Sequence, residues 1–264
     1  RAFKILFSSL TFVFWFPWLV LEMKTIGYVI SAASKGYIDS NIGTIVISML
    51  IIIYCYYGGA RATVMGNVVQ SLTFIVLGSV IMYYLIHRAY GGILPLYTLI
   101  RDVKPELLTL HGRFGVNPWA SSCIVGILGV FCWPGMFCRL YMGKNLKAVK
   151  KVVLISPLVG AVMQILVLIL GLGGSLIANF PIDTQIGLFF LANKFGGALL
   201  LSLVAIVAIS ACTSTIAAVI NGGAILIAKD LKLSVKGKDR DQILFYAKSS
   251  TIVVGLISLW VATI

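Results

Sequence analysis

The chain has 264 residues, of which 60% are hydrophobic and only 11% are charged, and its formal net charge is +13. Soluble globular domains average about one-quarter charged residues and less than half apolar residues. The long uncharged runs, at residues 40–60, 62–86, 114–138, 152–182 and 195–228, each match or exceed the roughly 20 residues that a helix needs to cross a bilayer. The composition therefore excludes a soluble enzyme, a nucleic-acid-binding protein, a disordered chain and a disulfide-stapled secreted domain. It indicates a polytopic membrane protein.

The apolar runs predict an all-α membrane bundle of about seven transmembrane helices in a single transmembrane domain covering residues 1–264. The expected spans are about 5–34, 42–57, 64–86, 118–139, 152–177, 195–228 and 243–264. A polar, proline-containing loop is expected between the third and fourth spans, at residues 87–117.

Positive charges favour one side of this arrangement. Seven spans place fourteen Lys and Arg residues on the side of Arg1 and six on the other side, while Lys24 lies within the membrane. Cytoplasmic loops carry the excess of Lys and Arg. We therefore expect a multi-pass protein of the cell (inner) membrane, with the N-terminal end of the chain in the cytoplasm and the C-terminal end outside.

Enzyme motifs are missing from the sequence. Both histidines, His87 and His111, fall in the expected outer loop, and no HExxH, GxSxG or Walker-type pattern occurs. The five cysteines lie inside or at the ends of apolar runs without any CxxC spacing, as small buried hydrophobic residues do. An enzyme is therefore not indicated.

Residues 57–70 connect the second and third spans and read YGGARATVMGNVVQ. Two adjacent glycines would allow a tight cytoplasmic turn there. The stretch resembles the sodium:solute symporter family, in which G-G-x-x-A-V-x-x-T-D-x-x-Q occurs in the same place. The two glycines, Ala62 and Gln70 match, whereas Gly66 and Asn67 replace the usual Thr and Asp. The family Asp is associated with cation passage, so Asn67 weakens the case for a second, acid-assisted cation site.

A second stretch, at residues 133–145, reads WPGMFCRLYMGKN. It is similar to a family pattern with a proline five residues before an arginine, followed by a small-residue turn with lysine. The resemblance implies that Trp133 and Pro134 border the solute beside the fourth span. Arg139 is interpreted as an anchor at the membrane interface.

A third stretch, ACTST at residues 211–215, lies inside the sixth span and is followed by Asn221. It resembles the family segment A-A-x-M-S-T-x-D-S, whose Ala carbonyl and two adjacent hydroxyls bind sodium. Matched residue by residue, these roles fall on Ala211, Ser214 and Thr215, with Ala217 where Asp is frequent. Oxygen is the ligand that hard cations prefer, which suits this set. In isolation, however, Ser and Thr in membrane helices commonly bond to their own helix.

Two charged residues, Glu22 and Lys24, lie inside the first expected span. Intramembrane charges are candidate functional residues, and residues two apart on a helix point to different faces. The segment 17–24 also looks like P-[YW]-x-x-L-Q-x-K of the third core helix in the family. Contact of Glu22 with substrate or a gating role, an ion pair and plain helix packing all remain open.

The resemblance implies the family fold, an inverted repeat of five plus five core helices, of which this chain looks like helices three to nine without one, two and ten. It implies sodium-coupled symport of a small organic solute such as an amino acid, a vitamin or a sugar, with sodium as the coupling ion. The expected partners are that solute and the lipid bilayer, and no nucleic acid. Two alternatives stay open: a symporter-like sensor domain of a histidine kinase, and a degenerate inactive copy.

Overall fold

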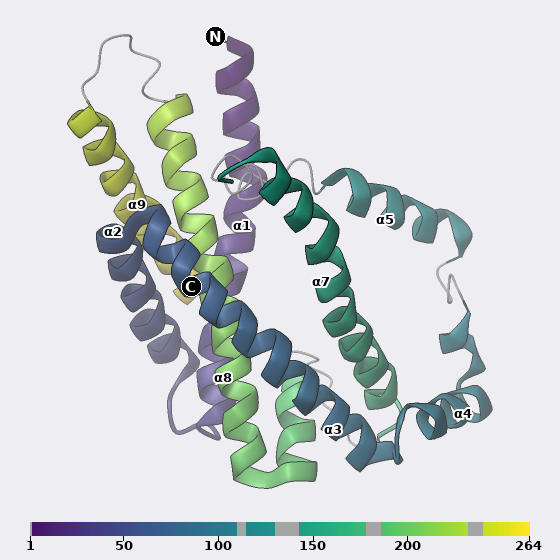
Figure 1. The fold of residues 1–264 in the computed structure, drawn as a ribbon. Helices are drawn as coiled ribbons and strands as arrows, with labels where there is room; N and C mark the ends of the chain where they lie inside the picture. The colour runs from purple at the N-terminus through teal and green to yellow at the C-terminus, as the bar shows by residue number, and fades with distance from the viewer. Residues whose placement is uncertain (1, 110–114, 130–142, 178–185, 232–239) are drawn as a thin grey trace. The chain divides into compact units, whose positions relative to one another are not determined.

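The structure is a computed structural model that describes residues 2–109, 115–129, 143–177, 186–231 and 240–264 (Figure 1). Every regular element in these ranges is a helix, which confirms the expected all-α class. The α-helices are α1 (Ala2–Ala33), α2 (Ser40–Leu72), α3 (Gly78–Tyr90), α4 (Ile93–Val103), α5 (Val116–Gly129), α7 (Leu146–Gly174), α8 (Gly187–Ile225) and α9 (Arg240–Thr263). Two π-helical stretches, η1 (Thr73–Leu77) and η6 (Leu226–Leu231), and one 3-10 turn, η2 (Pro105–Leu108), complete them.

Five helical stretches in the described ranges are long and apolar enough to cross a membrane. They are Ser8–Ala33, Ser40–Tyr90, Leu146–Gly174, Gly187–Ala228 and Leu244–Thr263, and Val116–Gly129 is a shorter apolar helix. Their surfaces are apolar as well: Leu154 and Leu158 of α7 are each 71% exposed. Extended exposed apolar surface marks a contact surface for other proteins or for the membrane, and on helices of this length it fits contact with lipid. The chain is a multi-pass membrane protein.

The stretch Ser40–Tyr90 contains two of the expected spans, 42–57 and 64–86, one on each side of a break at Gly59. Gly59 has φ 55° and ψ −160°, a conformation that a residue with a Cβ rarely adopts. Side chains hold the break together: the Tyr54 hydroxyl donates to the Ala62 carbonyl at 2.7 Å. The glycine pair thus forms the turn that its sequence predicts.

The structure differs from the expectation of a loop at 87–117, because residues Ile93–Val103 of this segment form the helix α4. Gly91, in the left-handed conformation, ends α3, and its neighbour Gly92 precedes α4. Leu96 and Ile100 lie four residues apart and are 1% and 3% exposed. Their burial, on a helix that contacts α3 and α7, explains why this polar-looking segment is helical.

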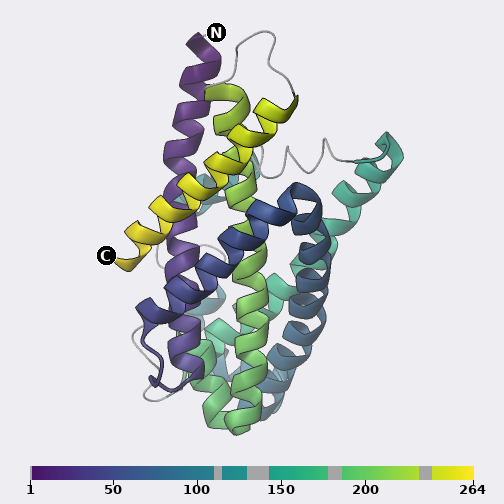
Figure 2. The same ribbon diagram turned by 90° about the vertical axis from the view of Figure 1, so that its left-hand side faces the viewer.

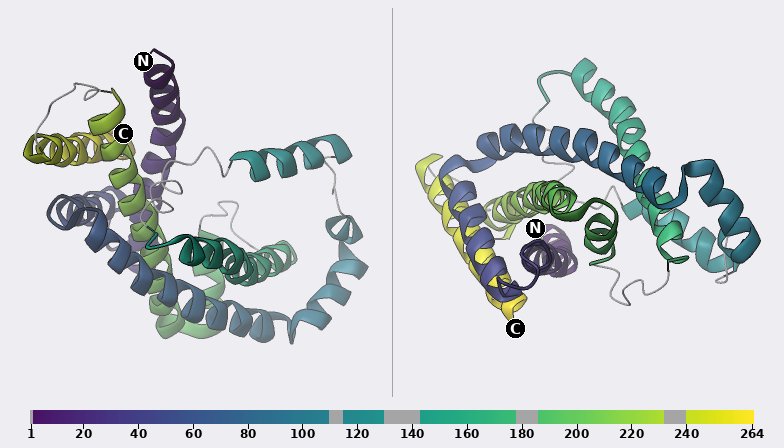
Figure 3. Two further views of the ribbon diagram at one scale, coloured as in Figure 1. Left: turned by 45° about the horizontal axis from the view of Figure 1, so that its top comes forward. Right: turned by 90° about the horizontal axis from the view of Figure 1, so that it is seen from below.

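One compact unit is formed by Arg1–Leu72 together with Ala205–Ile264. In it, α1 contacts α2, α9 and η6, and α9 also lies against α2 (Figures 2 and 3). Contacts are close where glycine is present. A Cβ on Gly27 of α1 would overlap the Ser40 carbonyl and the Thr44 hydroxyl of α2.

The other compact unit is Thr73–Val204, in which α3 packs on α7 and α4. A Cβ on Gly173 of α7 would approach the Tyr90 ring to 2.8 Å, and the Ser79 hydroxyl lies 3.1 Å from the Met163 sulfur. Helix α5 holds the beginning of the expected fourth span, up to Gly129; the remainder of that span, 130–139, lies outside the described residues.

Candidate functional site

The expected sodium ligands lie together on the part of α8 that belongs to the first unit. The Ser214 hydroxyl donates to the Ala211 carbonyl at 2.8 Å, and the Thr215 hydroxyl donates to the same oxygen at 3.2 Å. All three residues are half-buried. Three oxygens thus meet within one turn of helix, and the hydroxyl lone pairs stay available as acceptors. This is the back-bonded form that membrane Ser and Thr commonly take, and it keeps the oxygens clustered.

Helix α8 packs antiparallel against α1 at this level (Figures 1 and 2). A Cβ on Gly223 would lie 2.7 Å from the Trp15 ring, which is itself 4% exposed. Eleven residues earlier on α8, Cys212 meets Glu22, seven residues further along α1. From the first contact to the second, the residue numbers rise along α1 and fall along α8. The two contacts therefore agree with an antiparallel pair.

Glu22 lies near Cys212, the residue that follows Ala211 in the chain. Its side chain lies within reach of the side chains of Cys212 and of Trp18, one turn earlier on α1. A thiol and an indole N–H can each donate a hydrogen bond to a carboxyl oxygen. Cys212 is the immediate neighbour of Ala211, and 7% of it is exposed. The structure thus brings Glu22 together with the segment 211–215.

A polar cluster surrounds Asn221, two turns along α8 from Ser214. The family resemblance gave Asn221 no role. The Asn221 amide nitrogen donates to the Ala217 carbonyl at 2.9 Å and to the Thr63 hydroxyl at 3.2 Å, and it lies 3.9 Å from the Cys55 sulfur. Thr63 in turn donates to the Gly59 and Ala60 carbonyls at 3.2 and 2.9 Å. Asn221 therefore bonds α8 to the second arm of the broken helix α2, at Thr63, and lies against Cys55 of the first arm.

An Asn within an apolar run was the available signal for this cluster, because buried amides require partners. Its partners, however, are 158 and 166 residues away in the chain. Trp133 and Pro134, the residues expected to border the solute, lie outside the described residues.

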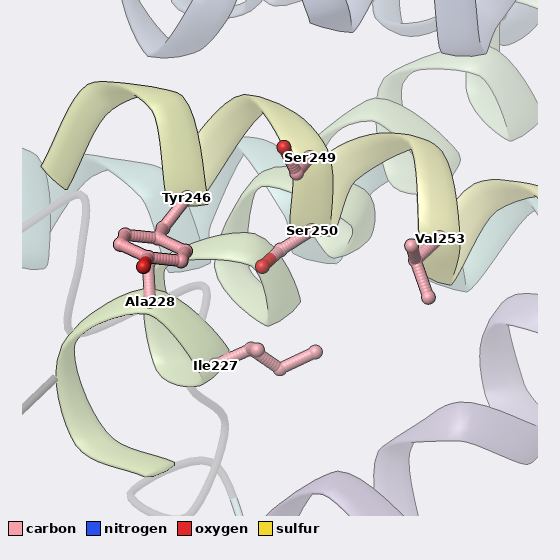
Figure 4. Close-up of a pocket in the computed structure, with 6 residues that line it drawn as sticks. All are labelled: Ile227, Ala228, Tyr246, Ser249, Ser250 and Val253. Atoms are coloured by element: carbon pink, nitrogen blue, oxygen red, sulfur yellow. The ribbon is translucent and has the colours of Figure 1, made fainter. Parts of the chain in front are cut away.

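A cavity of about 200 Å³ lies between η6 and α9 (Figure 4). Its lining comprises Ile227, Ala228, Tyr246, Ser249, Ser250 and Val253. None of the expected site residues lines it, and its walls are mainly apolar. It is therefore separate from the oxygen cluster on α8.

Comparison with known proteins identifies the family. The profile of the sodium:solute symporter family matches residues 5–264. The chain belongs to the sodium:solute symporter family. The family that matches is one of symporters.

Relatives agree with this assignment. The uncharacterized symporter YhjB of Bacillus subtilis is 28% identical over 166 residues, which are 62% of this chain and 33% of that protein. The sodium/pantothenate symporter of Haemophilus influenzae is 25% identical over 217 residues, 80% of this chain and 44% of that protein. The chain thus spans less than half the length of these curated relatives.

The fold has a solved counterpart. A substrate-bound, outward-open Na+-coupled sialic acid symporter superposes with a TM-score of 0.71 over 97% of this chain and 57% of its own, at 19% identity. At this identity the likeness concerns the fold. It confirms that the helices follow a transporter architecture.

Proposed function

We propose that the protein is a sodium-coupled symporter, in which the inward sodium gradient drives uptake of a small organic solute. The observation that carries this proposal is the convergence of the Ser214 and Thr215 hydroxyls on the Ala211 carbonyl. Membership of the sodium:solute symporter family supports it.

The oxygen cluster on α8 suits sodium chemically. A hard cation takes oxygen ligands, and at membrane depth these are hydroxyls and backbone carbonyls that line a cavity between helices. Ala211, Ser214 and Thr215 supply one such face of a site. The remaining ligands would come from other helices of the complete protein.

The solute path is the other half of the proposal. Trp133 and Pro134 would border the solute, the indole through its ring face and the proline by breaking the helix. An amino acid, a vitamin or a sugar are the solute classes considered. Two relatives are named sodium/pantothenate symporters, which supports including pantothenate, a vitamin, in the first panel of solutes.

The membrane orientation is proposed from charge. Fourteen Lys and Arg residues on one side against six on the other place the N-terminal end of the chain in the cytoplasm. The distribution fits an inner or cytoplasmic membrane, across which the sodium gradient is directed inward.

Uptake into proteoliposomes tests the proposal. The full-length protein is given a panel of radiolabelled solutes with an inward gradient of either sodium or choline. We expect uptake of one solute class only with sodium, and a loss of at least tenfold in Ser214→Ala and Thr215→Ala. Ser202→Ala is the matched control, because Ser202 also bonds back along α8, to the Ala198 carbonyl at 3.0 Å, outside the cluster. Uptake that is equal in sodium and choline and unaffected by both substitutions would contradict the proposal.

A further inference from the structure

The cavity between η6 and α9 lies within the first compact unit and at membrane depth. Ile227 and Ala228 end the membrane-spanning stretch Gly187–Ala228, and the other lining residues belong to the stretch Leu244–Thr263. The cavity therefore lies near one end of both stretches, where the hydrocarbon of a bilayer meets its headgroups. Tyrosine, present here as Tyr246, is enriched at this boundary.

One buried hydroxyl faces this cavity. The Ser250 side chain points into the space between α9 and η6 (Figure 4), and only 9% of the residue is exposed. The next residue, Thr251, donates to the Ala247 carbonyl one turn earlier at 3.0 Å, as membrane Ser and Thr commonly do. Among the described residues, none forms a hydrogen bond with the Ser250 hydroxyl. Because buried hydroxyls normally have a partner, an acceptor for Ser250 is to be sought in a ligand of the cavity.

The walls around Ser250 suit hydrocarbon. Ile227, Ala228 and Val253 are apolar, and none of the six described residues that line the cavity is charged. An apolar cavity of about 150 Å³ stays dry and binds benzene. A cavity of about 200 Å³ therefore admits a short length of hydrocarbon. A phosphate or a carboxylate would find no opposite charge among these lining residues.

The cavity is continuous with the outer surface of α9. Val253 lines the cavity and is 52% exposed, and further along the helix Leu256 and Ile257 are 43% and 48% exposed. An exposed apolar face on a membrane-spanning helix fits contact with lipid. A molecule of the bilayer can therefore enter the cavity without crossing water. A phospholipid combines a hydrocarbon chain with an uncharged ester carbonyl, which accepts hydrogen bonds, just below the headgroup.

We propose that this cavity is a phospholipid site, in which Ser250 donates a hydrogen bond to an ester carbonyl of the lipid. The first methylenes of that acyl chain lie against Ile227, Ala228 and Val253, and the chain continues along the exposed apolar face of α9. The phosphate stays outside the cavity, in the headgroup region. This inference is independent of the proposed sodium site, because it concerns retention of lipid and not transport.

Competition between two lipids tests the hydrogen bond. The purified full-length protein is reconstituted with equal amounts of an ester-linked and an ether-linked phospholipid that share headgroup and chain length. It is then extracted in mild detergent, and the retained lipid is measured by native mass spectrometry. The ether lipid has no carbonyl, so we expect the ester lipid to be retained about threefold better, the effect of one hydrogen bond between membrane groups. Ser250→Ala should lose this preference, whereas Ser202→Ala, whose hydroxyl bonds to the Ala198 carbonyl outside the cavity, should keep it.

Filling the cavity tests its occupancy. Val253→Trp places a large ring at the exposed side of the cavity and should abolish retention of the phospholipid. Ile252→Trp is the matched control, because Ile252 is the neighbouring residue on α9, is 36% exposed and does not line the cavity. This variant should retain the lipid as the wild type does.

Each outcome decides one part of the proposal. Equal retention of the ester and ether lipids by the wild type would overturn the hydrogen bond from Ser250, whatever the variants show. Undiminished retention in Val253→Trp would overturn the lipid site. So would a full-length wild type that retains no phospholipid, the result expected if another segment of the complete protein covers the cavity. The comparison of the two lipids needs no substitution, so it decides the question even if a variant fails to fold.

Discussion

Replacement of Asn221 by Ala should weaken the attachment of the Gly59 turn to α8 by a measurable amount. The inter-helix bond that is lost joins the Asn221 amide nitrogen to the Thr63 hydroxyl at 3.2 Å. The bond to Ala217 lies within α8, and the Cys55 sulfur at 3.9 Å contributes little. Hydrogen bonds between membrane helices average about 0.6 kcal/mol and reach about 1.7 kcal/mol. We therefore expect the free energy of unfolding to fall by about 1 kcal/mol.

A double-mutant cycle isolates this bond. The free energies of unfolding of the full-length protein, Asn221→Ala, Thr63→Val and the double variant are measured by titration with SDS in mixed micelles. Thr63→Val alone also loses the bonds to the Gly59 and Ala60 carbonyls, and the cycle removes that contribution. The expected coupling between the two sites is about 1 kcal/mol.

The control pairs Asn221→Ala with Ser202→Ala. These residues are far apart in the chain and share no hydrogen-bond partner, so their effects should add. A coupling between Asn221 and Thr63 below about 0.3 kcal/mol, no larger than that of the control pair, would refute the reasoning. The link between α8 and the turn would then contribute nothing to stability.

Three further predictions concern packing, each measured by the same unfolding titration. Gly59→Ala should cost about 1–3 kcal/mol because φ is 55° there; a loss below about 0.5 kcal/mol would contradict the break. Gly27→Ala should cost about 1–3 kcal/mol, since its Cβ would overlap a backbone carbonyl of α2, whereas Gly171→Ala, with open space around it, should be neutral or stabilising by up to about 1 kcal/mol. Equal effects of these two would refute the close approach. Lys248→Met should lower the free energy of unfolding by about 0.5–1 kcal/mol, because it removes the ammonium 5.3 Å from the Tyr56 ring centre. The loss should be the same in a Tyr56→Phe background, which keeps an aromatic ring.

The sequence predicted structure correctly where the interactions join residues that are close in the chain. The glycine pair at 58–59 predicted a turn, and the structure breaks α2 at Gly59 because its conformation requires glycine. The spacing of Ala211, Ser214 and Thr215 placed three oxygens within one helical turn, and their hydrogen bonds follow from that geometry alone. That these oxygens bind sodium stays a prediction.

Pattern was misleading at α4. Charged and polar residues from 101 onward, together with Pro95 and Pro105, made 87–117 look like a loop. The helix from Ile93 to Val103 is nevertheless supported by burial of Leu96 and Ile100 against neighbouring helices. Propensity describes an isolated segment, whereas burial depends on which partner lies alongside.

The amino-acid sequence by itself determined that this chain resides in a membrane, that it is helical and to which family it belongs. These properties depend on the transfer of apolar side chains from water to lipid and on the spacing of residues along one helix, and both are written locally in the chain. The tertiary structure decided which polar groups meet: Glu22 with Cys212, and Asn221 with Thr63 and Cys55. Residues more than 150 positions apart become neighbours only when whole helices pack, because the hydrophobic effect is non-directional and does not itself specify partners.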